Sequence, residues 1–356
     1  MKLAIILGTR PEIIKMSPLI RECEKRGLDY FILHTGQHYS YELDAIFFDQ
    51  LELPKPRHNL NIGSGSHAEE TGKMLIAIER LLLEEKPDIV LVEGDTNSVL
   101  AGALTAAKLH ISLGHVEAGM RSYDRYMPEE INRIVTDHIS DYLFAPTGNS
   151  KRILLFEGIS EDKIFVTGST IVEAINENVE IAMRKARPII NVEPFTYCLA
   201  TIHRQENVDV PERLADILDG LEKLYKISGL AVILPVHPRT RKNLDSFGID
   251  IPEGVRLIEP LGFLEFLYME RNARLILTDS GGVQMEACIL HIPCVTLRSS
   301  TEWVETLEVG ANVLSGTEPA AIVASAKQML EKSNLWEQPL GDGTATVQTL
   351  DIIAGL

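Results

Sequence analysis

The sequence predicts an α/β protein made of two doubly wound domains. Short apolar runs rich in Ile, Val and Leu alternate with amphipathic, helix-length segments along nearly all of the 356 residues. These runs are continuously apolar and do not alternate with polar residues, which is typical of parallel strands covered by helices on both faces. The composition agrees with a globular protein, because 45% of the residues are hydrophobic and 24% are charged.

The expected strands fall into two series along the chain. The first series comprises Leu3–Gly8, Tyr30–Thr35, Ile89–Asp95, Ile111–Glu117, Tyr142–Pro146 and Ile164–Gly168. The second series comprises Tyr197–His203, Ala231–His237, Val255–Pro260, Leu275–Ser280 and Cys294–Arg298. Segments such as His67–Lys86 and Thr96–His110 lie between strands and are expected to be helices.

A connector separates the two series. A long polar helix, Ile171–Arg187, is followed by two proline-containing steps, Arg187-Pro188 and Glu193-Pro194. We expect residues 1–170 to form an N-terminal Rossmann-like domain that carries most acid/base residues. Residues 171–338 are expected to form a C-terminal Rossmann-like nucleotide-binding domain, and residues 339–356 a helix that packs back on the N-terminal domain. Ligands of such sheets bind beyond the carboxyl ends of the strands, so the site is expected in a cleft between the domains.

The charge and the cysteines exclude several classes of protein. The 34 basic and 51 acidic residues give a net charge of −17, which argues against nucleic acid and anionic membranes as partners. Cys23, Cys198, Cys288 and Cys294 are scattered without paired spacing, so we expect reduced thiols, a cytoplasmic setting and no zinc site. No signal peptide is expected, and no apolar run is long enough to span a bilayer.

The stretch GHVEAGMRSYDRYMPEEINR, residues 114–133, is the strongest candidate for a reactive site. An apolar run ends on the carboxylate of Glu117, and a proline-started helix then carries Glu129 and Arg133. Glu129 and Arg133 are four residues apart, so the spacing predicts that they share a helix face and form an ion pair. Carboxylates and guanidiniums gathered at a strand-to-helix crossing are costly in a core but suit proton transfer on an anionic ligand.

Polar residues follow other predicted strands as well. Arg10 and Lys15 follow the first strand, Asp95 follows the third, and His203 and His237 end two strands of the second series. Each also has a plain structural role open to it: Arg10 as a surface residue, Asp95 as a helix cap, and His203 as a loop histidine bonded to a carbonyl. Their convergence on strand ends favours a functional site.

A nucleotide site is indicated by the segment LTDSGGVQME. A strand leads into the turn Ser280-Gly281-Gly282 and then a helix, whose free N–H groups and dipole favour a phosphate. Glu286 lies one turn into that helix, where its carboxylate can accept hydrogen bonds from ribose hydroxyls. There is no Walker A sequence, and the Gly63–Gly65 segment lacks the third glycine of a dinucleotide fingerprint. The nucleotide is therefore expected to be part of the substrate, with neither NAD nor ATP as a cofactor.

Taken together, these residues resemble the non-hydrolysing UDP-N-acetylglucosamine 2-epimerases. The matching stretches are GTRPEIIKMSPLI, GQH, EGDTNS, GHVEAGMRS, PEEINR, HRQEN, PVHP and TDSGGVQMEA, in family order over nearly the whole chain. The resemblance implies a fold of the glycosyltransferase B type, a cytoplasmic homodimer, and no metal or cofactor. It also implies reversible conversion of UDP-GlcNAc to UDP-ManNAc for surface glycans. UDP leaves by anti elimination after loss of the C2 proton, and it adds back to the 2-acetamidoglucal with C2 inverted.

The resemblance also implies roles for individual residues. The implied catalytic residues are Asp95, Glu117, Glu129 and His203. The implied substrate-binding residues are Arg10, Lys15, Arg133, His237, Phe266, Ser280, Gly281, Gly282 and Glu286. Within that set Arg133 is expected to hold Glu129, Phe266 to lie near the uracil, and Glu286 to hold the ribose.

The chain departs from the family pattern in two places. Many bacterial members carry an arginine where this chain has Trp303, so a phosphate contact is expected to be lost there. The segment YSYELD after Gln37-His38 differs from the shorter basic form of bacterial relatives, in which this region helps to bind an activating UDP-GlcNAc. Three alternatives stay open: a hydrolysing epimerase that releases ManNAc and UDP, a glycosyltransferase of the same fold, and a non-catalytic sensor.

Overall fold

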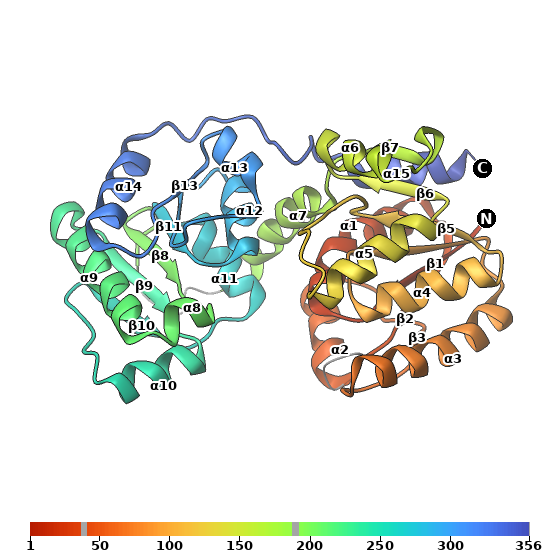
Figure 1. The fold of residues 1–356 in the computed structure, drawn as a ribbon, viewed down its shortest axis with the longest axis horizontal. Coiled ribbons are helices and arrows are strands. Elements are labelled where there is room, and N and C mark those ends of the chain that lie inside the picture. The colour runs from red at the N-terminus through yellow and green to blue at the C-terminus, as the bar shows by residue number, and fades with distance from the viewer. Residues whose placement is uncertain (37–40, 187–191, 356) are drawn as a thin grey trace. The chain divides into compact units, whose positions relative to one another are not determined.

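The computed structural model describes residues 1–36, 41–186 and 192–355. The chain divides into two compact units; in Figure 1 the first is red to yellow and also carries the blue C-terminal helix, and the second is mostly green to blue. The first unit comprises Met1–Ala174 with Leu340–Leu356, and the second comprises Ile175–Pro339. Within the described residues, no helix is long and apolar enough to cross a membrane.

The first unit is built on a seven-stranded parallel sheet in the order β3-β2-β1-β4-β5-β6-β7. Its strands are β1 (Lys2–Leu7), β2 (Asp29–His34), β3 (His58–Asn59), β4 (Ile89–Glu93), β5 (Ser112–Val116), β6 (Tyr142–Ala145) and β7 (Ile164–Val166). Its main helices are α1 (Arg10–Arg26), α2 (Tyr41–Gln50), α3 (His67–Glu85), α4 (Asn97–Lys108), α5 (Pro128–Ile139), α6 (Gly148–Phe156) and α15 (Ala345–Ala354). Helix α7 (Thr170–Lys185) begins in this unit and continues into the second.

The second unit repeats this plan with a six-stranded parallel sheet in the order β10-β9-β8-β11-β12-β13. Its strands are β8 (Tyr197–Thr201), β9 (Ala231–Pro235), β10 (Val255–Ile258), β11 (Leu275–Thr278), β12 (Cys294–Thr296) and β13 (Asn312–Leu314). Its helices are α8 (Gln205–Val208), α9 (Pro211–Ser228), α10 (Pro238–Phe247), α11 (Phe263–Arg271), α12 (Gly281–Ile289), α13 (Val304–Glu308) and α14 (Pro319–Glu331).

The α/β fold class predicted from the sequence is confirmed, and so is each expected strand. The short β3 and β13 were not predicted, because two or three residues leave no apolar run to detect. In each sheet the strand order reverses between two neighbours, β1 and β4 in the first unit and β8 and β11 in the second. In doubly wound sheets such a reversal marks the place where a ligand binds.

The cores account for the rigidity of these strand ends. In the first unit, Ala4 and Ile6 of β1 pack in one buried cluster with Val92 of β4 and with Met74 and Ile78 of α3. Burying each large aliphatic side chain contributes roughly 1.5–3 kcal/mol, so the central strands are fixed and the polar residues that follow them are held in place.

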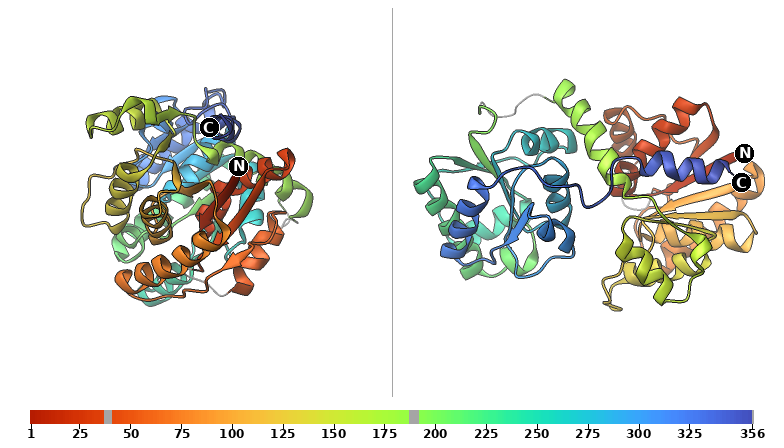
Figure 2. Two further views of the ribbon diagram at one scale, coloured as in Figure 1. Left: turned by 90° about the vertical axis from the view of Figure 1, so that its right-hand side faces the viewer. Right: turned by 90° about the horizontal axis from the view of Figure 1, so that it is seen from above.

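The carboxyl-terminal segment is joined to the first unit by several contacts. Helix α15 lies beside α1, as Figure 2 shows, and Arg26 Nη1 lies 2.6 Å from Asp351 Oδ1. The backbone N–H of Ser169 donates to Leu340 O at 2.8 Å, which ties the segment in at the start of α7.

Candidate active site

The backbone is strained at Glu117, which lies among several carboxylates of the first unit. Glu117 directly follows β5 and has a φ of 68°, in the left-handed region that residues other than glycine seldom adopt. Gly119, two residues later, has a φ of 81°. Strain of this kind costs about 1–3 kcal/mol and is found mostly where function requires a fixed side chain.

Glu117 belongs to a buried ion cluster with Lys15 of α1 and Glu93 of β4. Lys15 Nζ contacts Glu117 Oε2 and lies 3.0 Å from Glu93 Oε1. Burial alone would lower the pKa of Lys15, but the charges of Glu117 and Glu93 outweigh it and raise that pKa above its usual range. The cluster therefore contains a permanent ammonium. Glu93 was not among the predicted site residues, because it reads as the last residue of an apolar strand.

The two carboxyls of this cluster differ in acidity. Burial raises the pKa of Glu93 well above its usual range. Lys15 acts to lower that pKa, but the neighbouring charge of Glu117 acts to raise it further. Burial also acts to raise the pKa of Glu117, but Lys15 and a hydrogen bond from Glu93 bring it down to about 2. At neutral pH the protonated member of the pair is Glu93.

Asp95 lies near this cluster and is held by Arg133. Thr96, not Asp95, caps α4, since its side chain accepts a hydrogen bond from Val99 N. Arg133 Nη2 of α5 lies 2.5 Å from Asp95 Oδ2, and Nη1 lies 2.8 Å from Glu130 Oε2. The predicted pairing of Arg133 with Glu129 is therefore wrong. Residues three and four apart both share a helix face, and Asp95 draws the guanidinium toward the Glu130 side.

Glu129 instead lines a polar cavity of about 370 Å³ together with Asp95. Other lining residues are His67, Glu70 and Asn132. Among the described residues no hydrogen bond or ion pair reaches the Glu129 carboxylate. It is therefore available to a ligand in this cavity, beside a carboxylate whose position is fixed.

A buried network fixes the loops that carry Asp95 and Glu117. His115 Nδ1 lies 2.7 Å from Asp137 Oδ1 of α5, and His115 Nε2 donates to Gly94 O at 2.9 Å. The other oxygen of Asp137 accepts the N–H of Gly119 at 3.2 Å and pairs with Arg121 at 2.7 Å. Arg121 is fully engaged in this network, so its role here is to shape the site.

Glu12 is a second buried carboxylate that the sequence did not reveal as part of the site. It completes a capping box with Thr9 at the start of α1 and accepts the N–H of Gly8 at 2.7 Å. Its other oxygen accepts a hydrogen bond from Thr96 Oγ1 at 2.6 Å, which joins the start of α1 to the start of α4. Arg10, also at the start of α1, places its guanidinium over the ring of Phe47 at 5.7 Å.

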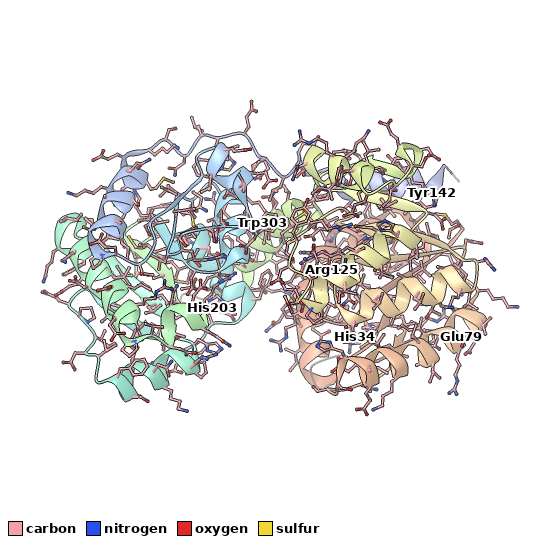
Figure 3. All side chains as sticks on the ribbon, in the orientation of Figure 1. His34, Glu79, Arg125, Tyr142, His203 and Trp303 are labelled. Carbon is pink, nitrogen blue, oxygen red and sulfur yellow. The ribbon has the colours of Figure 1, made fainter. Side chains whose placement is uncertain are left out.

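In the second unit a histidine and an aspartate meet at the strand reversal. His203 follows β8, and its Nδ1 lies 2.9 Å from Oδ1 of Asp279, which follows β11. Asp279 is fully buried and also accepts the N–H of Arg204 at 3.0 Å and Nδ2 of Asn207 at 3.1 Å. Burial acts to raise the pKa of Asp279, but these hydrogen bonds outweigh it and lower that pKa. The contact with His203 lowers it most. Asp279 thus stays ionised and directs the His203 ring. His203 is labelled in Figure 3.

His203 lines a cavity of about 500 Å³ with Arg204, His237 and Arg239. His237 also caps α10, since its Nδ1 accepts the N–H of Arg239 at 3.2 Å. The cavity lining also includes Glu206, and Arg239 is paired with Asp209. The two histidines and Arg204 still make this cavity suited to an anion.

The start of α12 lies at the same sheet edge. A Cβ at Gly281 would lie 2.1 Å from Glu302 Oε1, so a larger residue there would require the Glu302 carboxylate to move. Gly282 is exposed, and the nearest atom to a Cβ there would be Ser280 Oγ at 3.9 Å. The backbone N–H groups of this turn are therefore open to a ligand. Glu302 is held by Arg298 at 2.9 Å.

Glu286, further along α12, faces a second carboxyl. Glu270 of α11 is completely buried, and its carboxyl shares a hydrogen bond with the carboxyl of Glu286. Burial and the neighbouring Glu286 raise the pKa of Glu270 well above its usual range, so Glu270 is a neutral acid beside Glu286. Phe266, on the same helix as Glu270, is half-buried.

The structure thus brings the predicted residues into two groups. Lys15, Asp95, Glu117 and Glu129 gather in the first unit, and His203, His237, Ser280 and Gly282 surround the strand reversal of the second. Gln37 and His38, which carried part of the resemblance, lie outside the described residues, as do Tyr39 and Ser40 of the YSYELD segment. Within the described part of the chain no cluster of acidic, histidine or cysteine side chains could hold a metal ion.

Comparison with known proteins shows the family of the chain. A family model described as UDP-N-acetylglucosamine 2-epimerase matches residues 21–354. The chain is 55% identical to the UDP-N-acetylglucosamine 2-epimerase of Methanocaldococcus jannaschii over 361 residues, covering 99% of each chain. The chain belongs to this epimerase family.

Two solved structures of the Methanocaldococcus jannaschii enzyme resemble this chain over the full length of both. One has a TM-score of 0.93 and 52% identity. The other holds UDP-GlcNAc and UDP and has a TM-score of 0.84 and 54% identity. A glycosyltransferase from Rickettsia africae, 13% identical with a TM-score of 0.59, shares the fold alone, in agreement with the predicted glycosyltransferase B type.

The family includes enzymes with another substrate. The chain is 43% identical over 360 residues to the UDP-2,3-diacetamido-2,3-dideoxy-D-glucuronate 2-epimerase of Pseudomonas aeruginosa, with both chains fully covered. Membership of the family therefore establishes an epimerase relationship and leaves the sugar to be argued from the site.

Proposed function

We propose that this protein interconverts UDP-GlcNAc and UDP-ManNAc by inverting C2, without hydrolysis. The observation that carries the proposal is the group of carboxyls at the ends of β4 and β5 and the start of α5, in a chain of this family. The acid/base groups there are Glu117, Asp95 and Glu129. Glu117 is fixed by a strained turn, Asp95 by an ion pair with Arg133, and Glu129 by its place in the first turn of α5.

The chemistry needs such a group because the C2 proton of the sugar is weakly acidic. A carboxylate takes the proton, the electrons of the C2–H bond form the C1=C2 bond, and the C1–O bond breaks as UDP leaves. UDP then adds back to C1 while a second acid delivers a proton to the opposite face of C2. Each general acid or base of this kind contributes roughly 100- to 10,000-fold in rate.

The second unit supplies the groups that stabilise the departing diphosphate. Its negative charge is met by the open N–H groups at Gly282 and by His203, whose ring is directed by ionised Asp279. Glu286 holds the ribose.

The cavity of the first unit favours a neutral sugar over a uronate. Asp95, Glu129 and Glu70 line it, and the guanidinium nearest to Asp95 is already paired. The carboxylate of a glucuronate in this cavity would face like charges, which is destabilising. This favours UDP-GlcNAc over the glucuronate derivative named for the Pseudomonas aeruginosa relative.

The proposal is tested by proton and phosphorus NMR of the purified protein with UDP-GlcNAc and no added metal or NAD. Formation of UDP-ManNAc, up to an equilibrium reached from either epimer, is expected. Free ManNAc with UDP would indicate the hydrolysing reaction. Turnover of the diacetamido-glucuronate derivative in preference to UDP-GlcNAc would overturn the choice of sugar.

A further inference from the structure

The ion cluster of Lys15, Glu93 and Glu117 contains two carboxyls, although one carboxylate would suffice as a general base. The Glu93 side chain is 2% exposed and that of Glu117 is 13% exposed, while Lys15 Nζ contacts both. Glu93 lies behind Glu117, on the neighbouring strand, where no substrate atom is needed to explain it. The Glu93 carboxyl is thus closed to a ligand, whereas the Glu117 carboxyl beside it is partly exposed.

The charges around the cluster require one proton. Lys15 balances one carboxylate, so two ionised carboxylates would leave a net negative charge in a buried place, which is costly. The other charged groups that face the cluster are Glu12 of α1, which disfavours ionised Glu93, and Arg133 of α5, which favours ionised Glu117. One shared proton makes the cluster neutral.

The geometry assigns that proton to Glu93. Within the described residues Glu93 Oε1 has no hydrogen bond with proper alignment, although Lys15 Nζ lies 3.0 Å away. An ionised carboxylate would leave this oxygen charged and poorly bonded, whereas a neutral acid tolerates the position and can donate to Glu117.

We propose that Glu93 and Glu117 work as one acid/base unit that shares a single proton, which Glu93 stores and Glu117 exchanges with the sugar. This inference rests on the proposed epimerase function and identifies which carboxyls hold the transferred proton. Glu93 is a positioning residue, since it acts through Glu117 and does not itself touch the substrate.

The step balances in both directions. In one direction the singly protonated pair gives its proton to C2 of the glucal while a UDP oxygen forms the bond to C1. In the other direction the doubly ionised pair takes the C2 proton, the C1–O bond breaks, and the proton passes on to Glu93. A single glutamate with a pKa of about 2 would be a weak base for this step, and the shared proton removes that difficulty.

The test compares three variants of the whole protein. Glu93→Gln keeps the shape and the hydrogen-bond donor but cannot release a proton, whereas E93D keeps a titratable carboxyl. Glu173→Gln is the matched control, because Glu173 is buried in α7 and accepts the N–H of Thr346 at 2.7 Å. Turnover, C2 deuterium exchange in D2O, UDP affinity and melting temperature are measured for each across pH.

We expect E93Q to keep its UDP affinity and to lose about 100-fold or more in both turnover and C2 exchange. E93D is expected to recover part of that loss with a shifted pH profile, and E173Q to match the wild type. Activity of E93Q within threefold of the wild type would overturn the inference. If E93Q does not fold, an E93D pH profile identical to that of the wild type would overturn it. Absence of C2 exchange in the wild type would instead reject the proposed function.

Discussion

Replacing Asp279 by Asn is expected to disable His203 without removing it. Asp279 accepts hydrogen bonds from the side chain and N–H of His203 and from Arg204 and Asn207. An asparagine offers one acceptor oxygen and turns an NH2 group toward some of these donors. The imidazole then loses the carboxylate that fixes its orientation and charge.

The size of the effect follows from these contacts. Asp279 is fully buried, so each donor left without an acceptor costs about 1–3 kcal/mol. Loss of an oriented general acid costs roughly 100- to 10,000-fold in rate. The pKa of Asp279 is lowered on folding, so the stability it contributes is present above its ordinary value of 3.8 and is lost as the pH falls through the folded pKa. The D279N stability penalty should therefore be largest at neutral pH and shrink in acid.

Steady-state turnover of UDP-GlcNAc and urea unfolding at neutral and acidic pH measure both effects. The matched control is Asp219→Asn, which removes an exposed aspartate that pairs with Lys223 on α9. D219N should match the wild type in both assays. A D279N variant that turns over within twofold of the wild type, with an intact melting temperature, would refute the orienting role of Asp279.

Three further predictions concern other parts of the site. Lys15→Met leaves Glu93 and Glu117 buried without their cation, so urea unfolding should show a loss of about 3–5 kcal/mol; a loss below 1 kcal/mol would contradict the buried cluster. Gly281→Ala should lower UDP affinity in calorimetry, because its Cβ would lie 2.1 Å from Glu302 Oε1 and would displace that carboxylate at the start of α12. Gly148→Ala has no atom within 4 Å of its Cβ and should leave binding unchanged; equal effects of the two variants would refute the steric account. Glu270 is a neutral acid in the folded state, so its contribution to stability is complete below its ordinary pKa of 4.5 and is lost as the pH rises through the folded pKa. The melting temperature of E270Q should therefore fall less than that of the wild type between pH 5 and pH 8, and identical curves would argue against a protonated Glu270.

The sequence predicted the sheets well because a buried parallel strand leaves a continuous apolar run in the chain. It also located the strand ends, and with them Glu117, His203 and the turn before α12. It missed Glu93, Glu12 and Asp279. Glu93 is the last residue of a strand, Glu12 belongs to a helix cap, and Asp279 directly precedes the Ser-Gly-Gly turn. Their partners, Lys15, Thr96 and His203, are 78, 84 and 76 residues away. Spacing along the chain carries no signal of such contacts.

The error at Arg133 has a different origin. Helical periodicity allows Arg133 to pair with either Glu129 or Glu130. The sequence alone does not show that Arg133 also forms an ion pair with Asp95, which lies in another loop. Tertiary contacts decided between two local options of similar energy.

Epimerisation through removal and return of the C2 proton is tested most directly by proton NMR of UDP-GlcNAc with the wild-type protein in D2O. The C2 proton signal is expected to disappear as deuterium enters, while UDP-ManNAc appears. UDP-ManNAc formed with its C2 proton retained would contradict this mechanism.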